Sequence, residues 1–132
     1  MILPNGATVA VADGESLTLF RNGGHEGQVS LSPLPSPELA AANAGGSHHS
    51  SAANPDDRTQ AEDGHAAASA AWLNSQVLDG KISSLVVIAA PRALGELRKH
   101  YHKALTAVLA GELAKDLAGH SKADIEAALG AA

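Results

Sequence analysis

The sequence predicts a single α/β domain, and two patterns lead to that prediction. In the first third of the chain, short runs of apolar or alternating residues are separated by glycine-rich turns, which is typical of antiparallel strands. Residues 85–90 form a continuous apolar run, typical of a strand buried on both faces, between two helical patterns. A chain of 132 residues fits one domain, 1–132.

The first third is expected to form an antiparallel meander of three strands, at residues 8–12, 17–21 and 28–34. β-branched and apolar residues fill the first strand, and the other two alternate in polarity. Asp13 and Gly14 begin the first turn, because Asp-Gly tolerates the positive φ that tight hairpins need. Residues 22–27 form the second turn.

Residues 35–64 interrupt this pattern, because proline, glycine and serine recur there without periodicity. This predicts a long flexible loop. Residues 66–78 then predict the first helix, since alanine favours helix and Ala70, Leu73 and Val77 repeat at helical spacing.

A second helix is expected to begin at Pro91, where the missing N–H of proline does no harm. Its buried stripe is expected at Leu94, Leu97, Tyr101 and Leu105, which requires one continuous helix through this segment.

Residues 106–118 fit both a helix and a strand. Leucines recur every four residues, as a continuing helix requires, and Leu109, Leu113 and Leu117 also fit one face of a strand. The near absence of β-branched residues slightly favours the helix. If 108–117 is a strand, the order is βββαβαβα, a mixed sheet with helical crossovers of the ribonuclease H-like group.

The last helix is expected to begin after Ser121, which is a suitable N-cap. Asp124 lies three residues further on, in the position of a capping box. Ile125 and Leu129 form its expected buried side.

Composition excludes several classes of function. The chain has no cysteine, which excludes disulfides, cysteine–zinc sites, thiol nucleophiles and iron–sulfur clusters. Aromatic residues make up only 2%, too few for base-stacking platforms, and the net charge of -5 argues against a generic polyanion binder. No apolar run of about 18 residues and no signal peptide are found, so we expect a cytoplasmic domain without membrane insertion.

Several segments together resemble one bacterial family. They are residues 3–7 with 9–14, 19–22, 50–57, 71–74, 89–98, 115–117 and 120–121. Pro-Arg-Ala-Leu-Gly-Glu-Leu-Arg at 91–98 is the most specific of them, and the resemblance covers nearly the whole chain. These segments are similar to the bacterial host attachment protein family, which is related to the middle domain of archaeal and eukaryotic peptide-chain release factors and of Pelota-type proteins.

The resemblance has implications for fold and ancestry. It implies that residues 108–117 form a strand, giving a mixed five-stranded sheet with helices on its faces, as in the release-factor middle domain. It also implies a translation-related ancestry. The name of the family reports an attachment phenotype and does not describe a mechanism.

Release-factor middle domains act through a Gly-Gly-Gln loop whose glutamine helps to position a water for peptidyl-tRNA hydrolysis. Residues 23–28, Gly-Gly-His-Glu-Gly-Gln, look superficially similar. However, Glu26 replaces the glycine two positions before the glutamine, and its carboxylate would repel a tRNA backbone. We interpret the segment as a glycine-rich hairpin and assign no catalytic residue.

Metal-dependent nuclease activity is not expected either. A ribonuclease H-like nuclease needs carboxylates on the first strand, on the first helix and at the end of the fourth strand. Asp13 supplies the first and Glu62 or Asp63 the second, but the fourth strand ends in Ala-Ala-Pro. His100 and His102 are two apart on the second helix and point in different directions, so no metal or other cofactor is predicted.

Charge is distributed unevenly along the chain. Residues 1–66 carry 2 basic and 8 acidic residues, and residues 67–132 carry 7 basic and 6 acidic ones. Much of the positive charge lies on the helix that begins at Pro91, which follows the end of a strand, where α/β sheets bind ligands and helix N-termini hold phosphates. The candidate binding residues are Arg92, Arg98, Lys99 and Lys103 on this helix, and His48, His49, Ser50, Ser51 and Arg58 in the 47–58 loop.

Three functions follow as hypotheses. The first is a non-enzymatic binding module of translation-related ancestry, which engages the ribosome, RNA or a ribosome-associated protein through the basic helix and the 47–58 loop. The second is a hydrolase acting on an ester or phosphate through the 23–28 turn or that loop. The third is a protein–protein adaptor in surface attachment.

Overall fold

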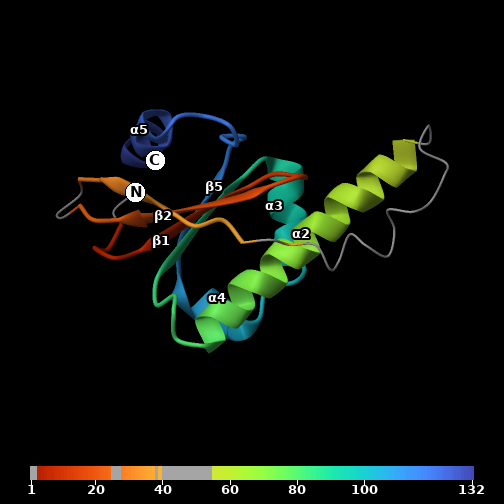
Figure 1. The fold of residues 1–132 in the computed structure, drawn as a ribbon, viewed down its shortest axis with the longest axis horizontal. Coiled ribbons are helices and arrows are strands. Elements are labelled where there is room, and N and C mark those ends of the chain that lie inside the picture. Colours follow the sequence, from red (N-terminus) through yellow and green to blue (C-terminus); the bar gives the residue numbers. More distant parts are fainter. Residues whose placement is uncertain (1–2, 25–27, 38, 40–54) are drawn as a thin grey trace.

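The computed structural model describes residues 3–24, 28–37, 39 and 55–132, without the side chains of 55–59. Its centre is a five-stranded sheet in the order β3-β2-β1-β4-β5 (Figure 1). The strands are β1 (Thr8–Ala12), β2 (Leu17–Asn22), β3 (Leu31–Leu34), β4 (Leu85–Ala89) and β5 (Leu109–Ala114). The first three are antiparallel neighbours, whereas β1, β4 and β5 run parallel. The predicted α/β class with a mixed five-stranded sheet is therefore confirmed.

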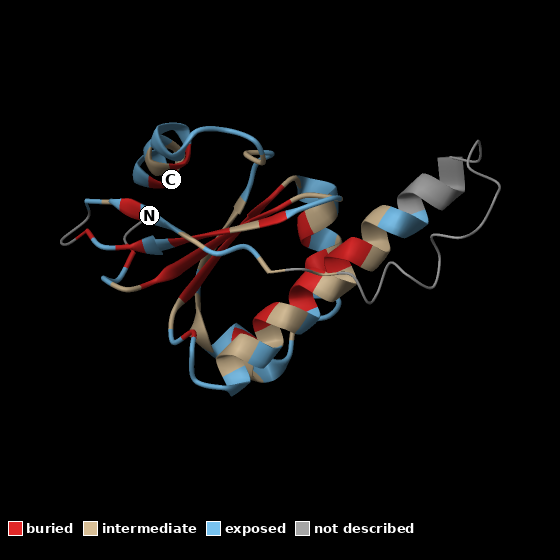
Figure 2. Ribbon diagram, in the orientation of Figure 1, coloured by how far each residue is buried: buried red, intermediate tan, exposed pale blue. Residues whose placement is uncertain are grey.

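Helices cover both faces of this sheet (Figure 1). They are α2 (Pro55–Leu78), α3 (Pro91–Arg98), α4 (Lys103–Val108) and α5 (Lys122–Ala131). One buried cluster joins α2, α3 and α4 to one face of the sheet, and a second cluster joins α5 to the other. Every residue of β1 and β4 is buried, because each strand has a neighbour on both sides and helices on both faces (Figure 2).

Small side chains form the contact between α2 and the sheet. Ala10 and Ala12 of β1 share one buried cluster with Ala66 and Ala70 of α2, and Ala70 is completely buried. Protein interiors are densely packed, so a larger side chain has little room at this contact.

Strand β5 settles the ambiguity over residues 106–118 in favour of the strand. The expectation that its leucines share one face is wrong, because Leu109 packs with the α2–α4 cluster and Leu113 with the α5 cluster. A register shift next to β4 explains the difference. Leu85 pairs with Leu109 but Val86 pairs with Gly111, so one extra residue reverses the direction of the side chains.

Helix α2 begins earlier than the sequence pattern indicated. Residues 55–64 belong to the helix, so the prediction of a loop over 35–64 is wrong for this part; residues 40–54 lie outside the described chain. Among the described side chains of α2, the buried ones begin at His65 (Figure 2), and the N-terminal end of the helix extends beyond the sheet (Figure 1). Apolar periodicity therefore marks only the part of α2 that contacts the core.

The single helix expected through Leu105 is also wrong, because α3 ends at Arg98 and α4 begins at Lys103. Asn74 of α2 holds the connection. Its side-chain amide donates to His100 O at 2.8 Å, and its carbonyl accepts from His102 N at 2.9 Å. His102 then caps α4, since its Nδ1 accepts from the backbone N–H of Ala104 at 2.9 Å.

Overpacking the contact between α2 and the sheet should destabilise the fold. We expect Ala70→Leu to lower the free energy of unfolding by about 1–3 kcal/mol, because extra methylenes in a filled core force side chains or backbone to shift. Ala71 is exposed on the same helix, so Ala71→Leu is the matched control. Denaturant unfolding of both variants provides the measurement, and equal stability of the two would contradict the close packing.

Candidate functional site

A pocket of about 200 Å³ lies where the three parallel strands end. Asp13 directly follows β1, Ala90 directly follows β4, and Asp116 follows β5 by two residues. The carboxyl ends of parallel strands are the usual position of ligand sites in α/β sheets. The charged residues that line the pocket are Asp13, Glu62, Asp63, Glu96, Asp116 and Arg92.

The first turn of the sheet forms one wall of this pocket. Asp13 Oδ1 accepts hydrogen bonds from the backbone N–H of Glu15 at 2.7 Å and of Ser16 at 2.5 Å. Partial burial alone would raise the pKa of Asp13. These hydrogen bonds and the nearby His65 together lower it by more than burial raises it, so the pKa lies below its ordinary value. The carboxylate of Asp13 therefore serves mainly to hold its own turn.

Gly14 makes room beside this turn, and this role differs from the positive φ expected of it. Its φ is not positive, unlike those of Gly6, Gly80 and Gly119. A Cβ at Gly14 would lie 2.6 Å from the side chain of Glu62 on α2. The glycine thus allows a close approach of the Glu62 carboxylate.

Arg92 lies among these carboxylates. Its Nη2 donates to Asp63 Oδ1 at 3.0 Å, which joins the start of α3 to α2. The N-terminus of α3, which the sequence suggested as a phosphate contact, therefore faces five carboxylates of the pocket and a single arginine. This charge is unfavourable for an anion.

The pocket contains two carboxylates that the sequence patterns did not assign to a site, Glu96 and Asp116. The ribonuclease H-like pattern places a carboxylate at the end of β4, whereas Asp116 follows β5, whose identity as a strand was ambiguous from the sequence. Within the described ranges, no three His, Asp or Glu side chains converge closely enough to hold a metal ion.

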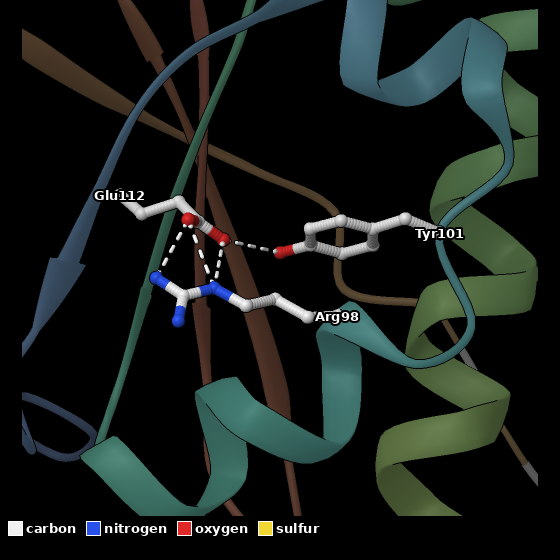
Figure 3. A network of polar contacts seen from close by, with 3 residues as sticks. All are labelled: Arg98, Tyr101 and Glu112. Carbon is white, nitrogen blue, oxygen red and sulfur yellow. Dashed lines mark hydrogen bonds and ion pairs between the residues drawn. The ribbon is translucent and has the colours of Figure 1, made fainter.

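A second polar region forms where α3 gives way to α4. Residues 98–103, Arg-Lys-His-Tyr-His-Lys, are here called the basic turn, and all of them except Tyr101 are exposed. Glu112 of β5 anchors it, as Figure 3 shows. Arg98 donates from Nε and Nη2 to Glu112 Oε1 at 3.1 and 2.8 Å, and the Tyr101 hydroxyl donates to Oε2 at 3.1 Å.

These contacts shift the pKa values of the basic turn. The hydrogen bond to Glu112 and its charge raise the pKa of Arg98. Burial, followed by the charge of Glu112 and the hydrogen bond to it, raises the pKa of Tyr101 well above its ordinary value. Lys99 Nζ donates to Glu96 Oε1 at 2.6 Å, and this bond raises the pKa of Lys99 and lowers that of Glu96. Each shift favours the protonation state that makes the contact: charged Arg98, Lys99 and Glu96, and the neutral hydroxyl of Tyr101.

The predicted cations fall in two regions that Glu96 connects. Arg98, Lys99 and Lys103 lie in the basic turn and Arg92 lines the pocket, while Glu96 lines the pocket and is also bonded to Lys99. His48, His49, Ser50 and Ser51 lie outside the described residues, and Arg58 falls in α2 without a described side chain.

The glycine-rich turn between β2 and β3 is described only in part, because residues 25–27 fall outside the described chain. At its base, Gly23 N donates to Ser30 O at 2.8 Å, and a side chain at Gly24 would overlap the carbonyl of Gln28. The fully buried Asn22 accepts from Gly24 N and Ser30 N at 2.9 and 3.1 Å. The two sides of the turn are therefore held together at its base, as in a hairpin.

The titration of Tyr101 offers a direct test of the Glu112 network, because the chain has one tyrosine. A folded pKa above the ordinary 10.0 means that Tyr101 contributes stability below about pH 10, which is lost as the pH rises through the folded pKa. We expect tyrosinate absorbance to appear at higher pH in the native protein than in urea. Glu112→Gln should lower the native midpoint, and equal native and denatured midpoints would contradict the network.

Comparison with known proteins places the chain in a family. The family model described as Bacterial archaeo-eukaryotic release factor family 12 matches residues 6–129, nearly the whole chain. No curated protein matches the chain. The predicted relation to release factors is thus confirmed, whereas nothing supports the assignment to host attachment. The chain belongs to bacterial archaeo-eukaryotic release factor family 12.

Proposed function

We propose that the protein is a non-catalytic binding module that associates with the ribosome or its RNA. Family membership carries the proposal, because residues 6–129 match a family named for release factors. The Gly-Gly-Gln tripeptide through which release-factor middle domains act occurs nowhere in the 132 residues. A release-factor-like domain without that tripeptide is suited to bind the translation machinery without hydrolysing its substrate.

The surface composition favours a polar mode of association. Among the described residues, Leu78 is the one large apolar side chain that is widely exposed, at 60%. Stable apolar interfaces require a contiguous apolar patch, which a single leucine does not provide. No described helix is long and apolar enough to cross a membrane. Charged side chains are therefore the main groups available for contact in the described part of the chain.

Sedimentation of the tagged protein in a bacterial lysate tests this function. On sucrose gradients we expect co-migration with ribosomal particles at low salt, and loss of it at moderate salt or after ribonuclease, because contacts with phosphate release counterions. Residence at the top of the gradient under every condition would contradict the proposal. Co-migration with a partner protein that persists after ribonuclease treatment would instead support a protein–protein adaptor.

A further inference from the structure

We infer that the basic turn, residues 98–103, is the surface that contacts the phosphate backbone of RNA. This inference rests on the proposed function and assigns its contact surface. It excludes Arg92, which the sequence had grouped with the other cations.

The nearby carboxylates leave part of the positive charge of the basic turn uncompensated. Glu112 is occupied by Arg98 and Tyr101, and Glu96 is bonded to Lys99. Within the described chain, no carboxylate lies within ion-pair distance of Lys103. Its ammonium group is therefore available to an external anion.

The two histidines add donors beside the lysines. His102 Nδ1 accepts the hydrogen bond from Ala104 N, so the hydrogen of the neutral ring is placed on Nε2. His102 can thus donate to a phosphate oxygen even when it is uncharged. His100 is exposed, and its backbone carbonyl is fixed by Asn74. Each exposed side chain of the turn therefore carries at least one N–H that can donate to a phosphate oxygen.

The backbone of the basic turn is held in place before any ligand binds. Asn74 holds it at both histidines, and Glu112 holds Arg98 and Tyr101 (Figure 3). These anchors come from α2 and β5, on either side of the turn in sequence. Binding to a preformed surface loses less conformational entropy than binding that must order a loop.

Glu96 of the pocket is bonded to Lys99, so the net charge of -5 bears on the basic turn, and distance along α3 separates Lys103 from the other carboxylates of the pocket. Helix α3 begins at the pocket and ends at the basic turn, and its eight residues span about 12 Å at 1.5 Å per residue. The Debye length at physiological ionic strength is about 8 Å. The carboxylates at the start of α3 are therefore largely screened from Lys103.

Binding of the full chain to a fluorescently labelled single-stranded RNA of mixed sequence, titrated over a range of salt, tests the assignment. We expect the double substitution Lys99→Ala and Lys103→Ala to weaken binding about tenfold or more. The slope of log affinity against log salt should fall by about one for each phosphate contact removed. The paired substitution Lys81→Ala and Lys122→Ala is the matched control, because it also removes two exposed cations but lies outside both the pocket and the basic turn, and it should leave binding nearly unchanged. Thermal unfolding of each variant confirms that it is folded.

The outcomes distinguish failure of the basic turn as the contact surface from failure of the proposed ribosome- or RNA-binding function. If the wild type binds RNA and the double variant of Lys99 and Lys103 binds equally well, or if the control pair of Lys81 and Lys122 weakens binding as much, the basic turn is not the contact surface, although the proposed function stands. If the wild type binds neither this RNA nor ribosomal particles, both are overturned. Ribosomal binding that survives ribonuclease and is unchanged in the double variant would assign a protein partner and overturn the RNA contact.

Discussion

The packing of α2 against the sheet and against α3 and α4 is the constraint on which both polar regions depend. Ala66, Ala70 and Leu73 of α2 share one buried cluster with residues of β1, β4, α3 and α4. The same helix supplies Glu62 and Asp63 to the pocket and, less than four turns later, Asn74 to the basic turn. A shift of α2 by one turn, about 5.4 Å, would disrupt both regions together. The polar geometry is thus determined by an apolar interface, and one of its residues, Ala66, also lines the pocket.

Local sequence signals predicted much of the fold. Strand β1 has the predicted bounds, and the continuous apolar run forms β4. Both strands lie inside the sheet and are buried along their whole length, so their sequences are apolar throughout and easy to recognise. The break between α3 and α4 could not be predicted in this way. Leu94, Leu97 and Leu105 are buried as one helical stripe would require, but Asn74, distant in sequence, holds the backbone open between them.

The candidate site was harder to predict, because its charges are set by partners distant in the sequence. Asp13, Glu62 and Asp63 could be named as carboxylates of one edge, since each precedes or follows a recognisable element. The ion pairs of Arg92 with Asp63 and of Arg98 with Glu112 join different elements, and no local pattern reveals them. Counting basic residues along a predicted helix therefore overstates the charge that a ligand would meet.

The two edges of the sheet bear on the solubility of the protein. Strand β3 contains Pro33, which has no N–H to offer a further strand, and the N–H of Leu31 is already bonded to Glu126 of α5 at 2.7 Å. At the other edge, the bulge in β5 interrupts the regular ladder. Open, regular edges promote aggregation by pairing with other chains. Each edge here carries a feature that opposes such pairing, which favours dispersed molecules even at high concentration.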